Sequence, residues 1–177
     1  MEKEAILQLL QQNYAQLIEQ VSQLDDRALL YAPTDKWNAL QQVDHLIKSV
    51  APVNKAFSLP NFILGWRFGY ANRPSRTYDA LVDRYHIKLQ AGGRAPGPFI
   101  PGPDIPITEK ERLLSQLDVE VRQLIKKTSR YKEFSLDKYI LPHPLLGMIT
   151  LREMIYFTAY HASHHGKNIE HGLVSLV

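Results

Sequence analysis

The sequence predicts an all-α fold: a four-helix bundle with a long Pro/Gly-rich crossover between helices 2 and 3. Three observations predict it. Apolar residues recur at spacings of three and four in four separate stretches. Residues that can cap a helix precede three of those stretches. The connection between the second and third is long, which suits a crossover between parallel helices better than a hairpin. With no internal repeat, convincing β-hairpin or βαβ pattern, we expect one domain over residues 1–177.

The first two helices are expected over residues 2–31 and 38–51. Each has an apolar stripe at helical spacing, made by Ile6, Leu10, Tyr14, Leu17, Val21 and Leu24 in the first and by Leu40, Val43, Ile47 and Val50 in the second. Asn38 is expected to cap the second helix. Pro52 marks either its boundary or a kink, because proline lacks the N–H that continues a helix.

The crossover, residues 58–107, is rich in proline and glycine, which favours loop and extended chain. A short helix is possible around residues 78–90. Aromatic residues in and just before this region indicate that the crossover packs on the rest of the protein; they are Phe57, Phe62, Trp66, Phe68 and Tyr70. Its arginines could meet an anionic substrate, although a solvated loop is the favoured interpretation; they are Arg67, Arg73 and Arg76.

The last two helices are expected over residues 108–130 and 150–171, with Thr108 and Thr150 as their caps. Each of these threonines is followed three residues later by a glutamate, as in a capping box. Residues 131–149 between them are expected to be irregular. The order of elements is therefore helix, helix, crossover, helix and helix.

Composition excludes several kinds of function. The chain has no cysteine, so it can form neither disulfides nor thiolate metal sites and supplies no thiol nucleophile. Its net charge is only +3, with no long basic run, so nucleic-acid binding is not expected. No apolar stretch is long enough to cross a membrane, and no signal peptide is seen. We therefore expect a cytoplasmic protein with no membrane partner.

Four of the seven histidines fall within residues 161–171. His161 and His165 are four residues apart, so on a helix they lie one turn apart on the same face and both can reach one metal ion. His164 points roughly 100° away from His165. Ala162 stands where a zincin protease has its glutamate, which disfavours that class. A pair of this kind is weak evidence alone, because many such pairs bind no metal.

His45 is the candidate for a third ligand, since His86 and His143 lie in less regular segments. Taking ~100° per residue, His45 lies roughly 150° from the centre of the apolar stripe of its helix. Periodicity alone therefore favours an exposed histidine. The same polar face could instead line a wet groove, and the pattern does not distinguish the two.

Two segments resemble a known family. Their residues are WNALQQVDHL at 37–46 and HPLLGMITL at 143–151, the second followed by the histidine pair at 161–165. Together they resemble the DinB-like superfamily, most closely its YfiT-like branch of metal-dependent hydrolases. The resemblance implies a four-helix bundle, often dimeric, whose metal ligands would be His45, His161 and His165. The sequence departs from the family in two places. Position 168 is asparagine, where the family often has glutamine, and residues 58–107 do not resemble the family, so the substrate pocket is expected to differ.

The resemblance also implies an activity. Three imidazoles would hold a divalent metal, with zinc or nickel favoured, and leave positions open for water or an external thiol. Transfer of a low-molecular-weight thiol such as bacillithiol, mycothiol or glutathione to an electrophilic small molecule ranks first, and hydrolysis of a small substrate second. Tyr160 and His164 could support the metal ligands or could equally be surface residues, and Asn168, one turn past His165, could orient a ligand through a hydrogen bond. The alternative is a non-catalytic bundle with a structural or vestigial metal site that serves as a dimerisation or interaction module.

Overall fold

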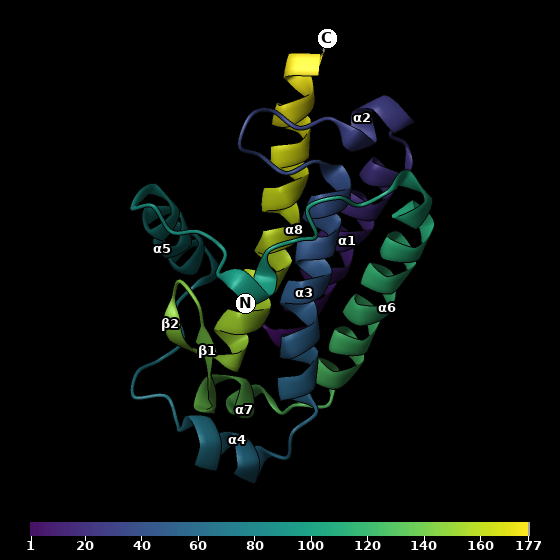
Figure 1. Ribbon diagram of the computed structural model, residues 1–177. Coiled ribbons are helices and arrows are strands. Elements are labelled where there is room, and N and C mark those ends of the chain that lie inside the picture. The colour runs from purple at the N-terminus through teal and green to yellow at the C-terminus, as the bar shows by residue number, and fades with distance from the viewer. Residues whose placement is uncertain (177) are drawn as a thin grey trace.

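Most of the chain is helical in the computed structural model, which describes residues 1–176. Four long helices lie side by side (Figure 1): α1 (Lys3–Ser22), α3 (Ala39–Phe57), α6 (Lys110–Ser129) and α8 (Leu151–Leu173). Both α1 and α3 pack against α6 and α8. Within the described residues, no helix is long and apolar enough to span a membrane. The expectation of a helical protein is thus confirmed.

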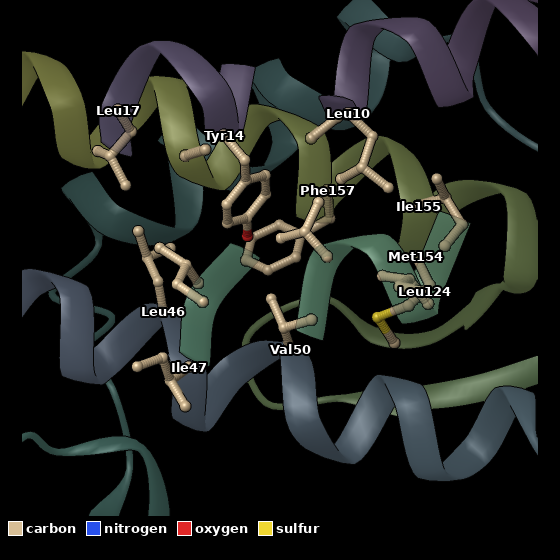
Figure 2. Close-up of a cluster of buried hydrophobic side chains, with 14 of the residues drawn as sticks. Leu10, Tyr14, Leu17, Leu46, Ile47, Val50, Leu124, Met154, Ile155 and Phe157 are labelled. Carbon is tan, nitrogen blue, oxygen red and sulfur yellow. The ribbon is translucent and has the colours of Figure 1, made fainter. Parts of the chain in front are cut away.

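The core lies where the four long helices meet. Figure 2 shows that side chains from all four point into it: Leu10, Tyr14 and Leu17 from α1, Leu46, Ile47 and Val50 from α3, Leu124 from α6, and Met154, Ile155 and Phe157 from α8. Most of them are fully buried. Burying a large apolar side chain contributes ~1.5–3 kcal/mol, so these stripes stabilise the packing that holds α3 and α8 together.

The first helix is shorter than expected. α1 ends at Ser22, and a separate short helix, α2 (Asp26–Leu30), follows it. The carboxylate of Asp25 accepts a hydrogen bond from the Ala28 N–H at 2.8 Å and so caps α2. The prediction of one helix over 2–31 is therefore wrong, because the aspartate starts a new helix instead of continuing the old one.

The second helix is longer than expected. α3 continues through Pro52 to Phe57. Pro52 lies on an exposed part of the helix, where water can satisfy the carbonyl that loses its N–H partner. The cap is as predicted, because Asn38 accepts from the Gln41 N–H at 2.9 Å and Gln41 accepts from the Asn38 N–H at 3.0 Å.

The crossover contains two helices, α4 (Asn61–Phe68) and α5 (Tyr78–Gln90), and a single helical turn, η1 (Gly97–Phe99). The helix expected around 78–90 is confirmed, and α5 packs on α8. The crossover packs on the rest of the protein as expected, through contacts of α4 with a β-hairpin, α5 with α8 and η1 with α3, but two of its aromatic side chains point outward. Phe62 and Trp66 are 74% and 83% exposed, because they share the outer face of α4, which is only two turns long.

Residues 131–149 are more regular than expected. They form α7 (Glu133–Lys138) and an antiparallel hairpin of β1 (Ile140–His143) and β2 (Gly147–Thr150). A hairpin was not expected from the sequence, and that expectation is wrong. The strands have only four residues each, too few for a visible alternation. The hairpin lies against α8 and brings His143 next to that helix.

Gly147 closes the hairpin turn with a φ of +76°, which L side chains rarely adopt. Gly147→Ala should therefore lower the free energy of unfolding by about 1 kcal/mol. Gly97→Ala is the matched control, because that glycine has no positive φ and nothing within 4 Å of an added Cβ. Chemical denaturation of both variants checks this, and equal losses would contradict the assignment of strain to Gly147.

The start of α8 is tied to the crossover. Thr150 caps the helix as predicted and forms a capping box with Glu153. The Glu153 side chain is fully buried and also binds Arg73 and Arg76, so neither arginine is free for an anionic substrate.

The predicted cap at Thr108 is wrong. Thr108 lies in the single turn η2 (Ile107–Glu109), and α6 begins at Lys110 without a side-chain cap.

Candidate metal centre

Three histidines from two facing helices meet at one point. α8 places His161 and His165 one turn apart on its buried face, and α3 contributes His45; their exposed fractions are 3%, 5% and 5%. One ring nitrogen from each lies within 4.8 Å of the other two. The Nε2 atom of His161 is 3.2 Å from that of His45 and 3.0 Å from that of His165.

The hydrogen bonds of His45 Nδ1 and His165 Nδ1 show which ring nitrogen carries the proton in these two histidines. His45 Nδ1 is 2.7 Å from the carbonyl oxygen of Phe99, which can only accept, so Nδ1 carries the proton. His165 Nδ1 donates in the same way to Oε1 of Gln42 at 2.9 Å. The Gln42 amide is oriented by its own Nε2–H, which donates to the Trp37 carbonyl at 3.2 Å. In the neutral rings, Nε2 of His45 and of His165 is therefore a bare lone pair.

This arrangement fits a divalent metal ion. Both lone pairs face His161 Nε2, and a single proton there could serve only one of the two contacts. Buried acceptors without a donor are costly, whereas a cation between the rings satisfies all three nitrogens. Imidazole nitrogen suits zinc, nickel, copper and iron, and an outer hydrogen bond on Nδ1 is the usual support of a metal-binding histidine.

Electrostatics keep the three rings neutral, as metal binding requires. Burial, followed by repulsion from neighbouring histidines, holds the pKa of His161 and of His165 well below the usual range. Burial also lowers the pKa of His45, although its hydrogen bond to Phe99 opposes this. At neutral pH the cluster thus presents lone pairs rather than positive charge.

His45 is buried, so the periodicity argument for an exposed histidine is wrong. The polar face of α3 binds the backbone of the crossover: Gln41 donates to the carbonyls of Gly102 and Pro103, Lys48 donates to that of Ile100, and Asp44 accepts from the Gly102 N–H. Spacing along one helix cannot reveal a face that a distant segment covers.

Gln42 offers a test of the supporting hydrogen bonds. Gln42→Leu should weaken metal binding ~10- to 100-fold, because His165 Nδ1 loses its acceptor and the ring its fixed orientation. Competition against a chromogenic chelator measures the affinity. Gln42→Glu is the control, since a carboxylate also accepts from Nδ1 and should retain most of the affinity. Equal affinity in the leucine variant and the native protein would contradict this role.

An apolar pocket adjoins the cluster. Its volume is about 290 Å³, and His45 and His161 line it together with side chains of α1, α3, α5, α8, the crossover and the β-hairpin. No aspartate, glutamate, lysine or arginine is among the described residues that line it. Tyr14 also lines the pocket, and its hydroxyl, which lies beside the Phe157 ring (Figure 2), is buried without a hydrogen-bond partner among the described residues. Burial raises the pKa of Tyr14, so the phenol stays neutral.

The other predicted site residues lie beside the cluster and contact one another. Asn168 Nδ2 donates to His164 Nε2 at 3.1 Å, and the Tyr160 hydroxyl lies 2.6 Å from His86 Nε2. None of them bonds to a ring nitrogen of the three clustered histidines in residues 1–176. Burial, with repulsion from His86, lowers the pKa of His164 to about 4. The supporting hydrogen bonds come instead from Gln42 and Phe99.

The sequence did not predict the roles of Gln42, Phe99 and His143. Helical spacing places Gln42 on the polar face of His45, as expected, but its hydrogen bond with His165 was not predicted. The contact with Phe99 joins residues 54 apart through a main-chain carbonyl, for which a sequence has no signal. His143 lies in the hairpin that was not predicted, although it belongs to the quoted HPLLGMITL segment.

The fold and the site together define a class: a helical protein in which three buried histidines from two helices could hold a divalent metal beside an apolar pocket. A family model described as DinB superfamily matches residues 6–169, and the chain belongs to that superfamily. No curated protein sequence matches the chain. The resemblance seen in the sequence is thus confirmed.

Proposed function

We propose that the protein is a metal-dependent enzyme that transfers a low-molecular-weight thiol to an electrophilic small molecule. His45, His161 and His165 would hold the metal, with zinc or nickel favoured. The observation that carries this proposal is the position of the cluster at the wall of the apolar pocket: two of the three histidines line that pocket. A small molecule in the pocket would therefore contact the centre directly, which a purely structural site does not require.

Each group in the site has a task that follows from its contacts. Phe99 and Gln42 hold His45 and His165 as donors at Nδ1, so that Nε2 remains free to bind. The apolar walls exclude water and so strengthen electrostatic interactions within the pocket. A bound divalent metal supplies positive charge that lowers the pKa of a coordinated thiol or water.

Two observations favour thiol transfer over hydrolysis. No carboxylate lines the described pocket, so water activation there would lack a carboxylate general base. A thiol, with an ordinary pKa of ~8.5, needs far less help to ionise than water. In the proposed reaction the thiol proton passes to solvent, sulfur bonds to the electrophilic carbon, and the leaving group departs with the electrons of the broken bond. Because the chain has no cysteine, the thiol is a cosubstrate.

We also infer that α1, α3, α6 and α8 form a four-helix bundle with residues 58–107 as its crossover, and that two copies form a homodimer. The packing of α1 and α3 on both α6 and α8 supports the bundle. The exposed side chains of Phe62 and Trp66 are apolar enough to lie in an interface. Light scattering coupled to gel filtration should give twice the mass of one chain, and the mass of a monomer would contradict the dimer.

Turnover is tested with 1-chloro-2,4-dinitrobenzene, an uncharged electrophile, and a panel of small thiols. The zinc- or nickel-loaded protein should form the thioether with release of chloride. Chelation should abolish the rate, and adding metal back should restore it. His161→Ala should be inactive under the same conditions.

Absence of thiol transfer above the metal-stripped control, across the panel, would contradict the proposal. Ester or amide turnover would then indicate hydrolysis. If neither occurs and chelation markedly lowers the melting temperature, the site is a structural one, because a metal that binds only the folded state stabilises it.

A further inference from the structure

The pocket beside the metal centre has a distinctive electrostatic character. Its lining within the described chain is apolar except for histidine, tyrosine, serine and threonine side chains. Of the three crossover arginines considered for anion binding, Arg73 and Arg76 are bound to Glu153, and Arg67 does not line the pocket. Placing a charged group in such a pocket without a partner is strongly unfavourable. The part of the ligand that lies away from the metal centre is therefore expected to be uncharged and largely apolar.

The size of the pocket sets a second limit. An engineered apolar cavity of ~150 Å³ holds one benzene molecule. The volume here, about 290 Å³, is roughly twice that. A substituted aromatic ring or an aliphatic molecule of similar bulk would fill it.

Outside the three-histidine cluster, His143 is a polar residue of this pocket whose proton position follows from its hydrogen bonds. Its Nδ1 accepts two backbone hydrogen bonds, from the N–H of Leu145 at 3.2 Å and from that of Leu146 at 3.1 Å. Both partners can only donate, so Nδ1 is unprotonated and the neutral ring carries its proton on Nε2. Burial lowers the pKa of His143 to about 4, which keeps the ring neutral in the physiological range.

The Nε2–H of His143 has no hydrogen-bond partner in the part of the chain that the structure describes. The Nε2 atom is not fully buried, and His143 lines the pocket, from which we infer that this N–H faces the pocket. The ring packs edge-on against Phe157 at 4.1 Å between centroids, and Phe157 in turn packs on His161 at 4.7 Å. A ligand in the pocket would thus lie between this donor and the metal centre.

We propose that His143 is a substrate-binding residue whose Nε2–H donates a hydrogen bond to an acceptor atom of an uncharged, mostly apolar substrate. The proposal deepens the proposed function by naming its substrate class, and rests on the pocket being the substrate site. A carbonyl, nitro or ether oxygen on an apolar body has the required chemistry.

The test compares two probes of nearly the same shape, acetophenone and cumene, of which only the first has an acceptor. Two-dimensional NMR titration of the metal-loaded protein, without thiol, gives the dissociation constant of each. His143→Asn keeps an oxygen near the position of Nδ1 for the two backbone donors but lacks a group at Nε2. It should weaken acetophenone binding ~5- to 10-fold, the effect of one hydrogen bond, and cumene binding less than about twofold.

His143→Gln is the reciprocal variant, because its amide N–H reaches the position of Nε2. It should retain the acetophenone affinity that the asparagine variant loses, even where loss of the turn hydrogen bonds lowers its melting temperature. The native protein without metal should bind 4-acetylbenzenesulfonate at least ~10-fold more weakly than acetophenone, since no charged side chain lines the described pocket.

Equal weakening of both probes by His143→Asn would overturn the proposal, because His143 would then only shape the pocket. Unchanged acetophenone binding, tight binding of the sulfonate, or no binding of either neutral probe to the native protein would overturn it as well. The assay is independent of turnover. If His143→Asn selectively lowers acetophenone affinity but the native protein shows no thiol transfer, the binding role of His143 holds and the proposed reaction is rejected. If thiol transfer occurs but acetophenone affinity does not change in His143→Asn, the reaction holds and the binding role is rejected.

Discussion

Replacing both His161 and His165 by alanine should abolish stoichiometric binding of a divalent metal. The native protein is expected to retain about one ion per chain after dialysis. The double variant should lose more than ~100-fold in affinity, since removing one supporting hydrogen bond alone costs ~10- to 100-fold. Elemental analysis by mass spectrometry, after purification without chelator, measures the content. Circular dichroism checks that the variant remains helical.

His171→Ala is the matched control for this experiment. His171 lies on the same helix and is exposed, outside the three-histidine cluster. It should therefore retain the native metal content. Unchanged metal content in the double variant would show that the ion binds elsewhere and would reject the cluster as the metal centre.

Glu153→Gln should lower the free energy of unfolding by about 3 kcal/mol. The Glu153 side chain is 0% exposed. Its carboxylate accepts from both ends of the Arg73 guanidinium at 2.7 and 2.9 Å, from the side chain and main chain of Arg76 at 3.1 and 2.8 Å, and from the Thr150 N–H at 3.0 Å. The amide can accept only some of these bonds and leaves two guanidinium groups without a counter-charge. Urea denaturation followed by circular dichroism measures the loss.

The same carboxylate predicts acid sensitivity. Although burial acts in the opposite direction, hydrogen bonds from Arg73, Arg76 and Thr150 lower the pKa of Glu153 from 4.5 to about 2. A group whose pKa is lower in the folded state contributes stability above its unfolded pKa and loses it as the pH falls. Native stability should therefore decline between about pH 5 and pH 2, and this decline should be shallower in Glu153→Gln.

Glu170→Gln is the control, because Glu170 is exposed on the same helix. Its effect on stability should be within ~0.5 kcal/mol. A loss in Glu153→Gln no larger than in this control would contradict the role of Glu153 in joining the crossover to α8.

The long helices were predictable because the apolar residues that pack in the core recur at regular intervals along each helix. The stripes that contain Leu10, Val50, Leu124 and Ile155 repeat every three or four residues and face the core. The predicted helix ends are wrong where a single residue, such as a capping aspartate or a proline, acts against the apolar pattern. Asp25 starts a new helix within an apolar repeat, and α3 passes through Pro52 because water can satisfy the exposed carbonyl there. The hairpin of β1 and β2 is too short for its alternation to be seen.

The site was only partly predictable. The spacing of His161 and His165 shows that they share a face, but only the family resemblance pointed to His45. Its burial depends on Phe99 and on the crossover backbone, 54 residues away in sequence. The role inferred for His143 depends on the backbone N–H groups of a turn, which no residue pattern encodes. Contacts between distant segments therefore limited the prediction.

X-ray absorption spectroscopy of the zinc-loaded protein tests the central claim most directly. Three imidazole nitrogens should surround the metal at ~2.0–2.1 Å in the native protein, and one fewer in His45→Ala. A shell without imidazole, or a spectrum that does not change in His45→Ala, would contradict it.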